Sequence, residues 1–221
     1  MFGGKSKANS GLFIKICGIT NESDARAAID AGADALGFNL VPRSRRYIDI
    51  NAAAAWIDNL SKEVCKVAVM ADPNWEDACR INHLSFIDAI QLHGSESPEF
   101  CRRLADAEIR FAKAVPVTAS KSLVDLPNYF TDAVILDSST GGKFGGTGKP
   151  FPWKFAPEFV RHHPRINVIL AGGLNPENVA DAVRAVSPRG VDVTSGVEAA
   201  PGRKDHRLMK AFVAAARHAA K

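Results

Sequence analysis

The sequence lacks the cysteine and histidine spacings that typify a metal site or a disulfide framework. Its four cysteines include no C-x-x-C pair, and no histidine cluster lies near them at zinc-like spacing. Zinc sites and redox motifs depend on such pairs. We therefore expect reduced thiols, no bound metal and a cytoplasmic protein. The cysteines are Cys17, Cys65, Cys79 and Cys101.

Long apolar runs and basic clusters are also absent. No window approaches the roughly 18 apolar residues of a membrane helix, and Met1 to Ser10 contain no apolar core of a signal peptide. The net charge of +4 is mild, and no block of lysine and arginine is interleaved with aromatic residues. We therefore expect neither a membrane nor a nucleic acid as partner. Residues 1–11 are expected to form a flexible extension.

The sequence does contain a regular alternation of short apolar runs and helical stretches. Of its 221 residues, 46% are hydrophobic and 24% are charged, as is usual for one globular domain. Successive runs start roughly 20 to 35 residues apart, the length of one βα unit, and strands joined by helices pair in parallel. The predicted strands are Phe13–Cys17, Ala35–Leu40, Cys65–Met70, Ile87–Leu92, Arg110–Val115, Ala133–Asp137, Asn167–Ala171 and Gly190–Thr194.

Eight such units predict an α/β fold, a single TIM (β/α)8 barrel of eight parallel strands over residues 12–221. A doubly wound sheet is the alternative. Ser97-Pro98 and Asn175-Pro176 each place a capping side chain before a proline, which predicts a helix start, and Gly32 predicts a helix end. The stretch Asp205 to Ala219 predicts a covering helix. Its apolar stripe would consist of Leu208, Phe212, Ala215 and Ala219.

Cys17 ends the first predicted strand. Because side chains alternate along a strand, Phe13, Lys15 and Cys17 share one face, while Ile14 and Ile16 share the other. A neighbouring ammonium favours the thiolate, which is the form that acts as a base or nucleophile. The alternative is a buried cysteine that serves only in packing.

Two glycine turns follow the last two predicted strands. Gly172 and Gly173 come after the seventh strand, and Ser195 and Gly196 come after the eighth. The loops after these two strands are the usual phosphate site of such barrels, where backbone N–H groups bind the anion. The sequence therefore predicts a phosphate site there.

Other polar residues stand at or near strand ends, where barrel enzymes place their active sites. Asp137 ends an apolar strand, and burial favours the protonated carboxyl that a general acid requires. Asp192 would bind a substrate hydroxyl or orient a neighbouring loop. His93 has no evident partner in the sequence and is predicted to be structural. The glycine-rich stretch Thr140 to Lys149 would be a lid over the substrate or a solvent loop.

Taken in order, these segments resemble the phosphoribosylanthranilate isomerase family of tryptophan biosynthesis. The order and spacing of the motifs carry the resemblance, which runs from Lys15 to Asp205. The motifs include Lys15-Ile16-Cys17-Gly18-Ile19-Thr20, Ser44-Arg45-Arg46, Gln91-Leu92-His93-Gly94, Leu136-Asp137-Ser138, Leu170-Ala171-Gly172-Gly173-Leu174 and Val193-Thr194-Ser195-Gly196-Val197-Glu198.

The resemblance implies an Amadori rearrangement of N-(5-phosphoribosyl)anthranilate, with no metal or organic cofactor. It implies that Asp137 is the general acid and Cys17 the general base. Arg46 would meet the anthranilate end of the substrate, although Arg45 beside it is a second candidate. Asp192 would meet a hydroxyl.

By the same resemblance, the backbone around Gly172, Gly173, Ser195 and Gly196 would hold the phosphate. The chain would act as a monomer or homodimer on a small-molecule substrate. The alternatives are another phosphate-binding barrel enzyme, such as indole-glycerol-phosphate synthase, and a non-catalytic barrel that binds a sugar phosphate.

Overall fold

A computed structural model of the chain describes residues 11–117, 123, 126–137 and 156–221. The segment Thr140 to Lys149, which is expected to be a lid or a solvent loop, lies outside the described residues. So do residues 1–10 of the expected N-terminal extension.

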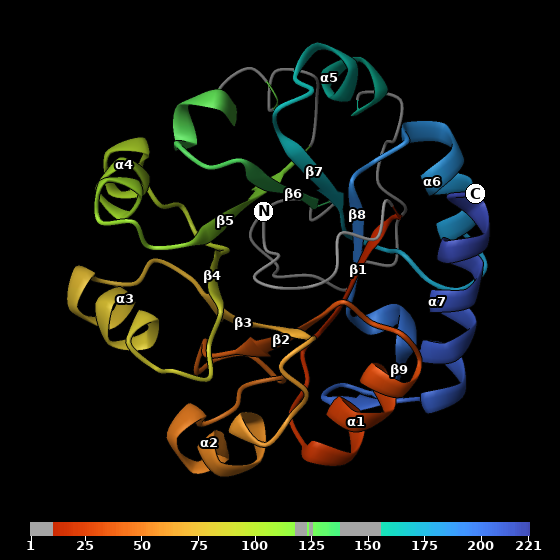
Figure 1. Cartoon of the computed structure of the whole chain (residues 1–221), viewed down its shortest axis with the longest axis horizontal. Coiled ribbons are helices and arrows are strands. Elements are labelled where there is room, and N and C mark those ends of the chain that lie inside the picture. The colour runs from red at the N-terminus through yellow and green to blue at the C-terminus, as the bar shows by residue number, and fades with distance from the viewer. Residues whose placement is uncertain (1–10, 118–122, 124–125, 138–155) are drawn as a thin grey trace.

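Eight parallel strands close into a barrel in the order of the sequence, and β8 pairs with β1. Figure 1 views this barrel end-on, with the helices around it. Closure confirms the TIM barrel and excludes the open doubly wound sheet. The strands are β1 Phe13–Cys17, β2 Ala35–Asn39, β3 Cys65–Met70, β4 Ala89–Leu92, β5 Phe111–Pro116, β6 Ala133–Asp137, β7 Asn167–Leu170 and β8 Gly190–Val193.

Helices cover the outside of the barrel, and within the described residues none is long and apolar enough to cross a membrane. The helices are α1 Glu22–Asp30, α2 Ile50–Asp58, α3 Trp75–Asn82, α4 Pro98–Asp106, α5 Ala156–His162, α6 Val179–Val186 and α7 His206–Ala219. The shorter elements are the 3₁₀ turns η2 Leu126–Tyr129 and η4 Ser195–Val197 and the antiparallel pair β9 Glu198–Ala200 and β10 Arg203–Lys204.

The eight expected strands are confirmed, with small differences at their ends. The fourth begins at Ala89 rather than Ile87. The expected start of α4 is also confirmed, because the Ser97 Oγ accepts a hydrogen bond from the Phe100 N–H at 3.2 Å and Pro98 opens the helix. Gly32, with a φ of +94°, follows the end of α1 as expected.

The expected helix start at Asn175-Pro176 is wrong, since α6 begins at Val179. The side-chain oxygen of Asn175 instead accepts hydrogen bonds from the N–H groups of Glu177 at 2.9 Å and Asn178 at 3.0 Å. These bonds close a local turn ahead of the helix, a conformation that asparagine stabilises as readily as a cap.

The covering helix α7 is confirmed, but its buried face is rotated from the expected stripe. Phe212 is buried as predicted, whereas Leu208 is 37% exposed. The buried set follows the spacing i, i+3, i+4, i+7, which places three further residues of the same helix against the barrel. These are Met209, Val213 and Ala216.

The side chains of β1 divide between two apolar layers as the alternation predicts. Ile14 and Ile16 are fully buried in the layer between the strands and the helices. Phe13 packs against a second cluster of mostly small residues inside the barrel, and Lys15 and Cys17 share this inward face. The polar members of β1 therefore point into the barrel rather than toward its helices.

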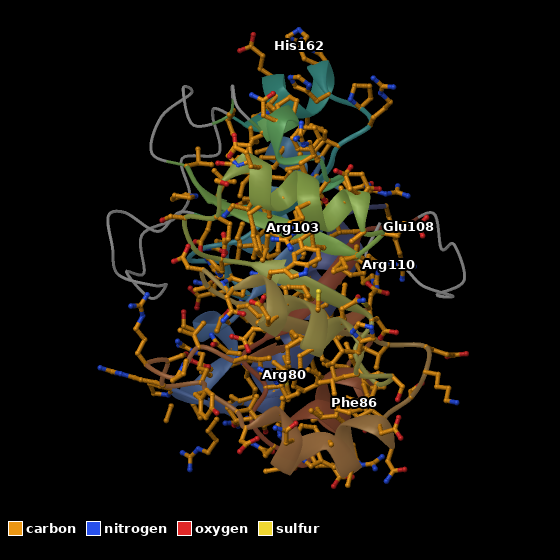
Figure 2. All side chains as sticks on the ribbon, turned by 90° about the vertical axis from the view of Figure 1, so that its left-hand side faces the viewer. Arg80, Phe86, Arg103, Glu108, Arg110 and His162 are labelled. Atoms are coloured by element: carbon orange, nitrogen blue, oxygen red, sulfur yellow. The ribbon has the colours of Figure 1, made fainter. Side chains whose placement is uncertain are left out.

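Figure 2 views the side of the barrel covered by α3 and α4. The guanidinium of Arg103 on α4 lies 3.9 Å from the centroid of the Trp75 ring on α3, a cation–π contact between the two helices. Glu108 and Arg110, just before β5, lie at the right-hand end of the barrel in this view. The strands therefore end at the left, where the active site is expected.

Asp34 connects three segments by hydrogen bonds at the end of the barrel where the strands begin. Its Oδ2 accepts hydrogen bonds from the Ile14 N–H and from the Arg217 Nη2, both at 2.7 Å. Arg217 of α7 also donates to the carbonyl oxygens of Leu12 and Gly32. One carboxylate thus joins β1, the α1–β2 loop and the last helix.

We predict that Asp34→Ala lowers the free energy of unfolding by about 2 kcal/mol, because hydrogen bonds to a charged group are lost and the Ile14 N–H keeps no partner. Urea unfolding followed by circular dichroism measures the change. The matched control is Asp30→Ala, an exposed aspartate nearby on α1, which should change stability by less than about 0.5 kcal/mol. Equal losses in the two variants would contradict this role of Asp34.

Candidate active site

A cavity of about 670 Å³ opens at the end of the barrel where the strands finish. It is the size of a small-molecule site. Every side chain that the sequence singled out for chemistry or substrate binding lines it, although these residues come from distant parts of the chain. They are Cys17, Arg46, Asp137 and Asp192, and they are joined by Gly172, Gly173 and Ser195 of the two glycine turns.

Gly196 is the predicted site residue that is not part of this lining. A Cβ at Gly196 would lie 1.9 Å from the carbonyl oxygen of Leu174. No side chain fits in that space, so the glycine lets the turn after β8 pack directly on the turn after β7. Its observed contribution is to hold the two turns together.

The two turns present backbone rather than side chains to the cavity. Gly172 and Gly173 have positive φ angles of 78° and 67°, the left-handed backbone that favours glycine. Within the described residues, their N–H groups donate to no protein acceptor. Ser195 opens the 3₁₀ turn η4 on the other side. Free N–H groups in such turns can donate hydrogen bonds to an anion.

Arg46 is held by a carboxylate from the far end of the chain. Its Nε and Nη2 donate to the two carboxylate oxygens of Glu198, both at 2.7 Å. Lys204 Nζ also donates to Glu198, at 3.2 Å, and to the Thr194 carbonyl oxygen. Burial would raise the pKa of Glu198, but the hydrogen bond from Arg46 and the charge of Lys204 outweigh it and lower that pKa. Glu198 therefore stays ionised and fixes the guanidinium.

Sequence reasoning missed the contact between His93 and Asp137. His93 Nε2 lies 3.2 Å from Asp137 Oδ2, and Nδ1 of the same ring lies 3.2 Å from the side-chain nitrogen of Gln91. All three residues line the cavity. His93 and Asp137 lie at the ends of two strands, 44 positions apart in the chain. The only sequence signal for their contact is that His93, like Asp137, stands at the end of a strand.

A metal site is not found in the described part of the chain, where no group of three or more His, Cys, Asp or Glu side chains is placed to hold an ion. The groups in the cavity that can exchange a proton include the Cys17 thiol, the Asp137 carboxyl and the His93 imidazole. They suit proton transfer.

Comparison with known proteins gives a consistent answer. The family model for N-(5′-phosphoribosyl)anthranilate (PRA) isomerase matches residues 14–215. The N-(5′-phosphoribosyl)anthranilate isomerase of Magnetococcus marinus is 44% identical over 206 residues, which cover 93% of this chain and 95% of that protein. The enzyme of the same name from Geobacter sp. strain M21 is 43% identical, covering 92% of this chain and 97% of that protein.

Solved structures agree with the sequence comparison. The phosphoribosyl anthranilate isomerase of Thermotoga maritima is 39% identical, with a TM-score of 0.85 over 94% of this chain and 99% of that chain. A complex of phosphoribosyl anthranilate isomerase with reduced 1-(o-carboxyphenylamino)-1-deoxyribulose 5-phosphate is 36% identical, with a TM-score of 0.81 and the same coverage. The chain belongs to the N-(5′-phosphoribosyl)anthranilate isomerase family.

Proposed function

We propose that this chain catalyses the Amadori rearrangement of N-(5-phosphoribosyl)anthranilate to 1-(2-carboxyphenylamino)-1-deoxyribulose 5-phosphate in tryptophan biosynthesis. The observation that carries the proposal is the single cavity into which an inward-facing thiol, a carboxyl, a fixed guanidinium and two glycine turns converge. Family membership supports it. The alternative of a barrel that only binds a sugar phosphate leaves the thiol and carboxyl without a role.

In the proposed reaction, Asp137 gives its proton to the ribose ring oxygen as the bond between that oxygen and C1 breaks. The substrate nitrogen supplies the electron pair that forms the C1=N bond of an open iminium ion. The Cys17 thiolate then removes the C2 proton to give a neutral enolamine. Solvent takes the C2 hydroxyl proton of this enolamine and supplies one at C1, which gives the ketone. Proton exchange with solvent returns Cys17 to the thiolate and Asp137 to the protonated acid. Asp137 and Cys17 thus act as general acid and general base.

The contacts of His93 suit it to orient the general acid. With the Gln91 amide donating to Nδ1, the ring proton is on Nε2 and is donated to Asp137 Oδ2. The proton to be transferred is then carried by the other carboxyl oxygen of Asp137. His93 acts in this proposal as a positioning residue.

Arg46 is proposed to bind the substrate carboxylate. Glu198 occupies Nε and Nη2, so the fixed guanidinium keeps its Nη1 group for a ligand in the cavity. Its neighbour Arg45 also lines the cavity but is exposed. A guanidinium that is already held in place loses less entropy on binding, which favours Arg46 over Arg45.

The two glycine turns are proposed to hold the phosphate, through N–H groups around Gly172, Gly173, Ser195 and Gly196. Asp192 is proposed to meet a substrate hydroxyl. One of its oxygens, Oδ1, accepts from Lys15 Nζ at 3.0 Å, and the carboxylate also lines the cavity. An ionised carboxylate has acceptor capacity beyond one such bond.

We predict that the purified protein converts phosphoribosylanthranilate without added metal, and that Cys17→Ala and Asp137→Asn each lower kcat by at least about a hundredfold. KM should change by no more than a few-fold, because the binding groups remain. Loss of substrate fluorescence measures turnover. An inactive wild-type protein would favour the sugar-phosphate sensor, and full activity in both variants would exclude the mechanism.

We predict that Arg46→Met raises KM by about tenfold or more, because a charge-assisted contact with the substrate carboxylate is lost. Glu198 keeps Lys204 as a partner in this variant. The matched control is Arg45→Met, which should leave KM within about twofold. Steady-state kinetics of both variants measures the difference, and the reverse ranking would assign the contact to Arg45.

We predict that Gly173→Ala raises both KM and the inhibition constant of inorganic phosphate about fivefold, because a left-handed residue with a Cβ costs about 1 kcal/mol and shifts the turn. The matched control is Gly32→Ala. Gly32 is also left-handed, but its Cβ would meet only Val213, at 3.6 Å. This control should lose stability and keep its KM. Unchanged phosphate inhibition in Gly173→Ala would place the phosphate elsewhere.

A further inference from the structure

Lys15 is a fully buried ammonium that the proposed reaction does not use. It has no exposed surface, and its Nζ lies 3.0 Å from Asp192 Oδ1 inside the barrel. The two residues are direct partners in the pairing of β1 with β8. Burying an ion pair costs desolvation that apolar residues would avoid, so stability alone explains such a pair poorly.

The space above Gly37 brings this ammonium to the Cys17 sulfur. Gly37 is the pairing partner of Cys17 on the neighbouring strand β2. A Cβ at Gly37 would lie 2.6 Å from Cys17 Sγ and 3.0 Å from Lys15 Nζ. Both atoms therefore border the same small volume, which only glycine leaves open, and they can be no farther apart than these two distances together.

The ammonium keeps its charge in this interior position. Burial would lower the pKa of Lys15, but the charge of Asp192, the interaction with Cys17 and the hydrogen bond to Asp192 outweigh it and raise that pKa. A permanent positive charge beside the thiol favours its ionised form, since an opposite charge within about 4–6 Å stabilises the charged state.

The other charged groups near the sulfur leave one positive charge in excess. Arg46 and Lys204 also interact electrostatically with Cys17, and Glu198 bonds to both of them. Three cations thus face two carboxylates, and a thiolate would balance the set. The cations are Lys15, Arg46 and Lys204, and the carboxylates are Asp192 and Glu198. The other charged or titratable side chains that line the cavity are those of His93, Asp137, Arg43 and Arg45.

We propose that Lys15 is a positioning residue for the general base: held by Asp192 inside the barrel, its ammonium stabilises the Cys17 thiolate that removes the substrate proton. The proposal rests on the proposed function of Cys17 as base. Lys15 acts from within the barrel through its effect on the thiol, and it exchanges no proton with the substrate itself.

The test measures the pH at which half of Cys17 is ionised, its ionisation midpoint. Carbon-13 NMR of protein labelled at the cysteine Cβ records this titration. Lys15→Met removes this cation and should raise the midpoint by about one pH unit or more. Asp192→Asn removes the neutralising carboxylate and should lower the midpoint. The double variant Lys15→Met/Asp192→Asn has no unpaired buried charge, and its midpoint should lie between those of the single variants.

Two other cysteines report whether each variant is folded. Burial raises the pKa of Cys65 to about 12 and that of Cys101 to about 11. Their signals therefore keep the thiol form at about pH 9.5 only while the core is intact, because an exposed cysteine, with a pKa of about 8.5, is mostly ionised there. The matched control is Lys113→Met. This ammonium is equally buried and pairs with Glu96 at 2.8 Å, but it lies on β5, across the barrel from β1. It should leave the Cys17 midpoint unchanged.

Opposite shifts in the two single variants support the proposal, because a general loosening of the barrel would move the midpoint in one direction only. The proposal is overturned if the Cys17 midpoint is the same in the wild type, Lys15→Met and the double variant, or if both single variants shift it the same way. The titration does not depend on turnover. An active Cys17→Ala would therefore reject the proposed base and leave the Lys15 result standing.

Discussion

Pairing of the last strand with the first is the constraint on which the active site depends. Phe13 to Ile16 on β1 pair with Gly190 to Val193 on β8, and this register closes the barrel. Closure brings the end of β1 beside the turn after β8, so that groups from opposite ends of the chain share one cavity. The continuous ring of backbone hydrogen bonds then holds these groups rigidly.

The same closure explains how charged side chains come to lie inside the barrel. Its interior is filled largely by small residues, including Ala35, Ala89, Ala112 and Ala133, which leave room for long side chains among the strands. Lys15 uses this room, and its Nζ lies 3.0 Å from the Oδ1 of Asp192. The buried charge is tolerated because it is paired, and the pair joins β1 to β8 beside the cavity that Asp192 lines.

Much of the fold could be predicted because its signals are local. Apolar runs bounded by turn residues located every strand of the barrel, although not the short pair β9 and β10, and a serine before a proline located the start of α4. The errors arose where two local signals compete. Asn175 can cap a helix or close a turn, and α7 can bury either of two overlapping faces, so Leu208 became exposed when Met209 was turned inward. Packing against the barrel decided both the turn at Asn175 and the buried face of α7.

The sequence by itself determined the alternating pattern of strands and helices, the inward face of β1, and the placement of Cys17, Asp137 and the glycine turns at strand ends. The tertiary structure alone decided which distant groups meet. The contact between His93 and Asp137 and the hold of Glu198 on Arg46 span 44 and 152 positions of the chain. Such contacts depend on barrel register and loop geometry, which no local preference encodes.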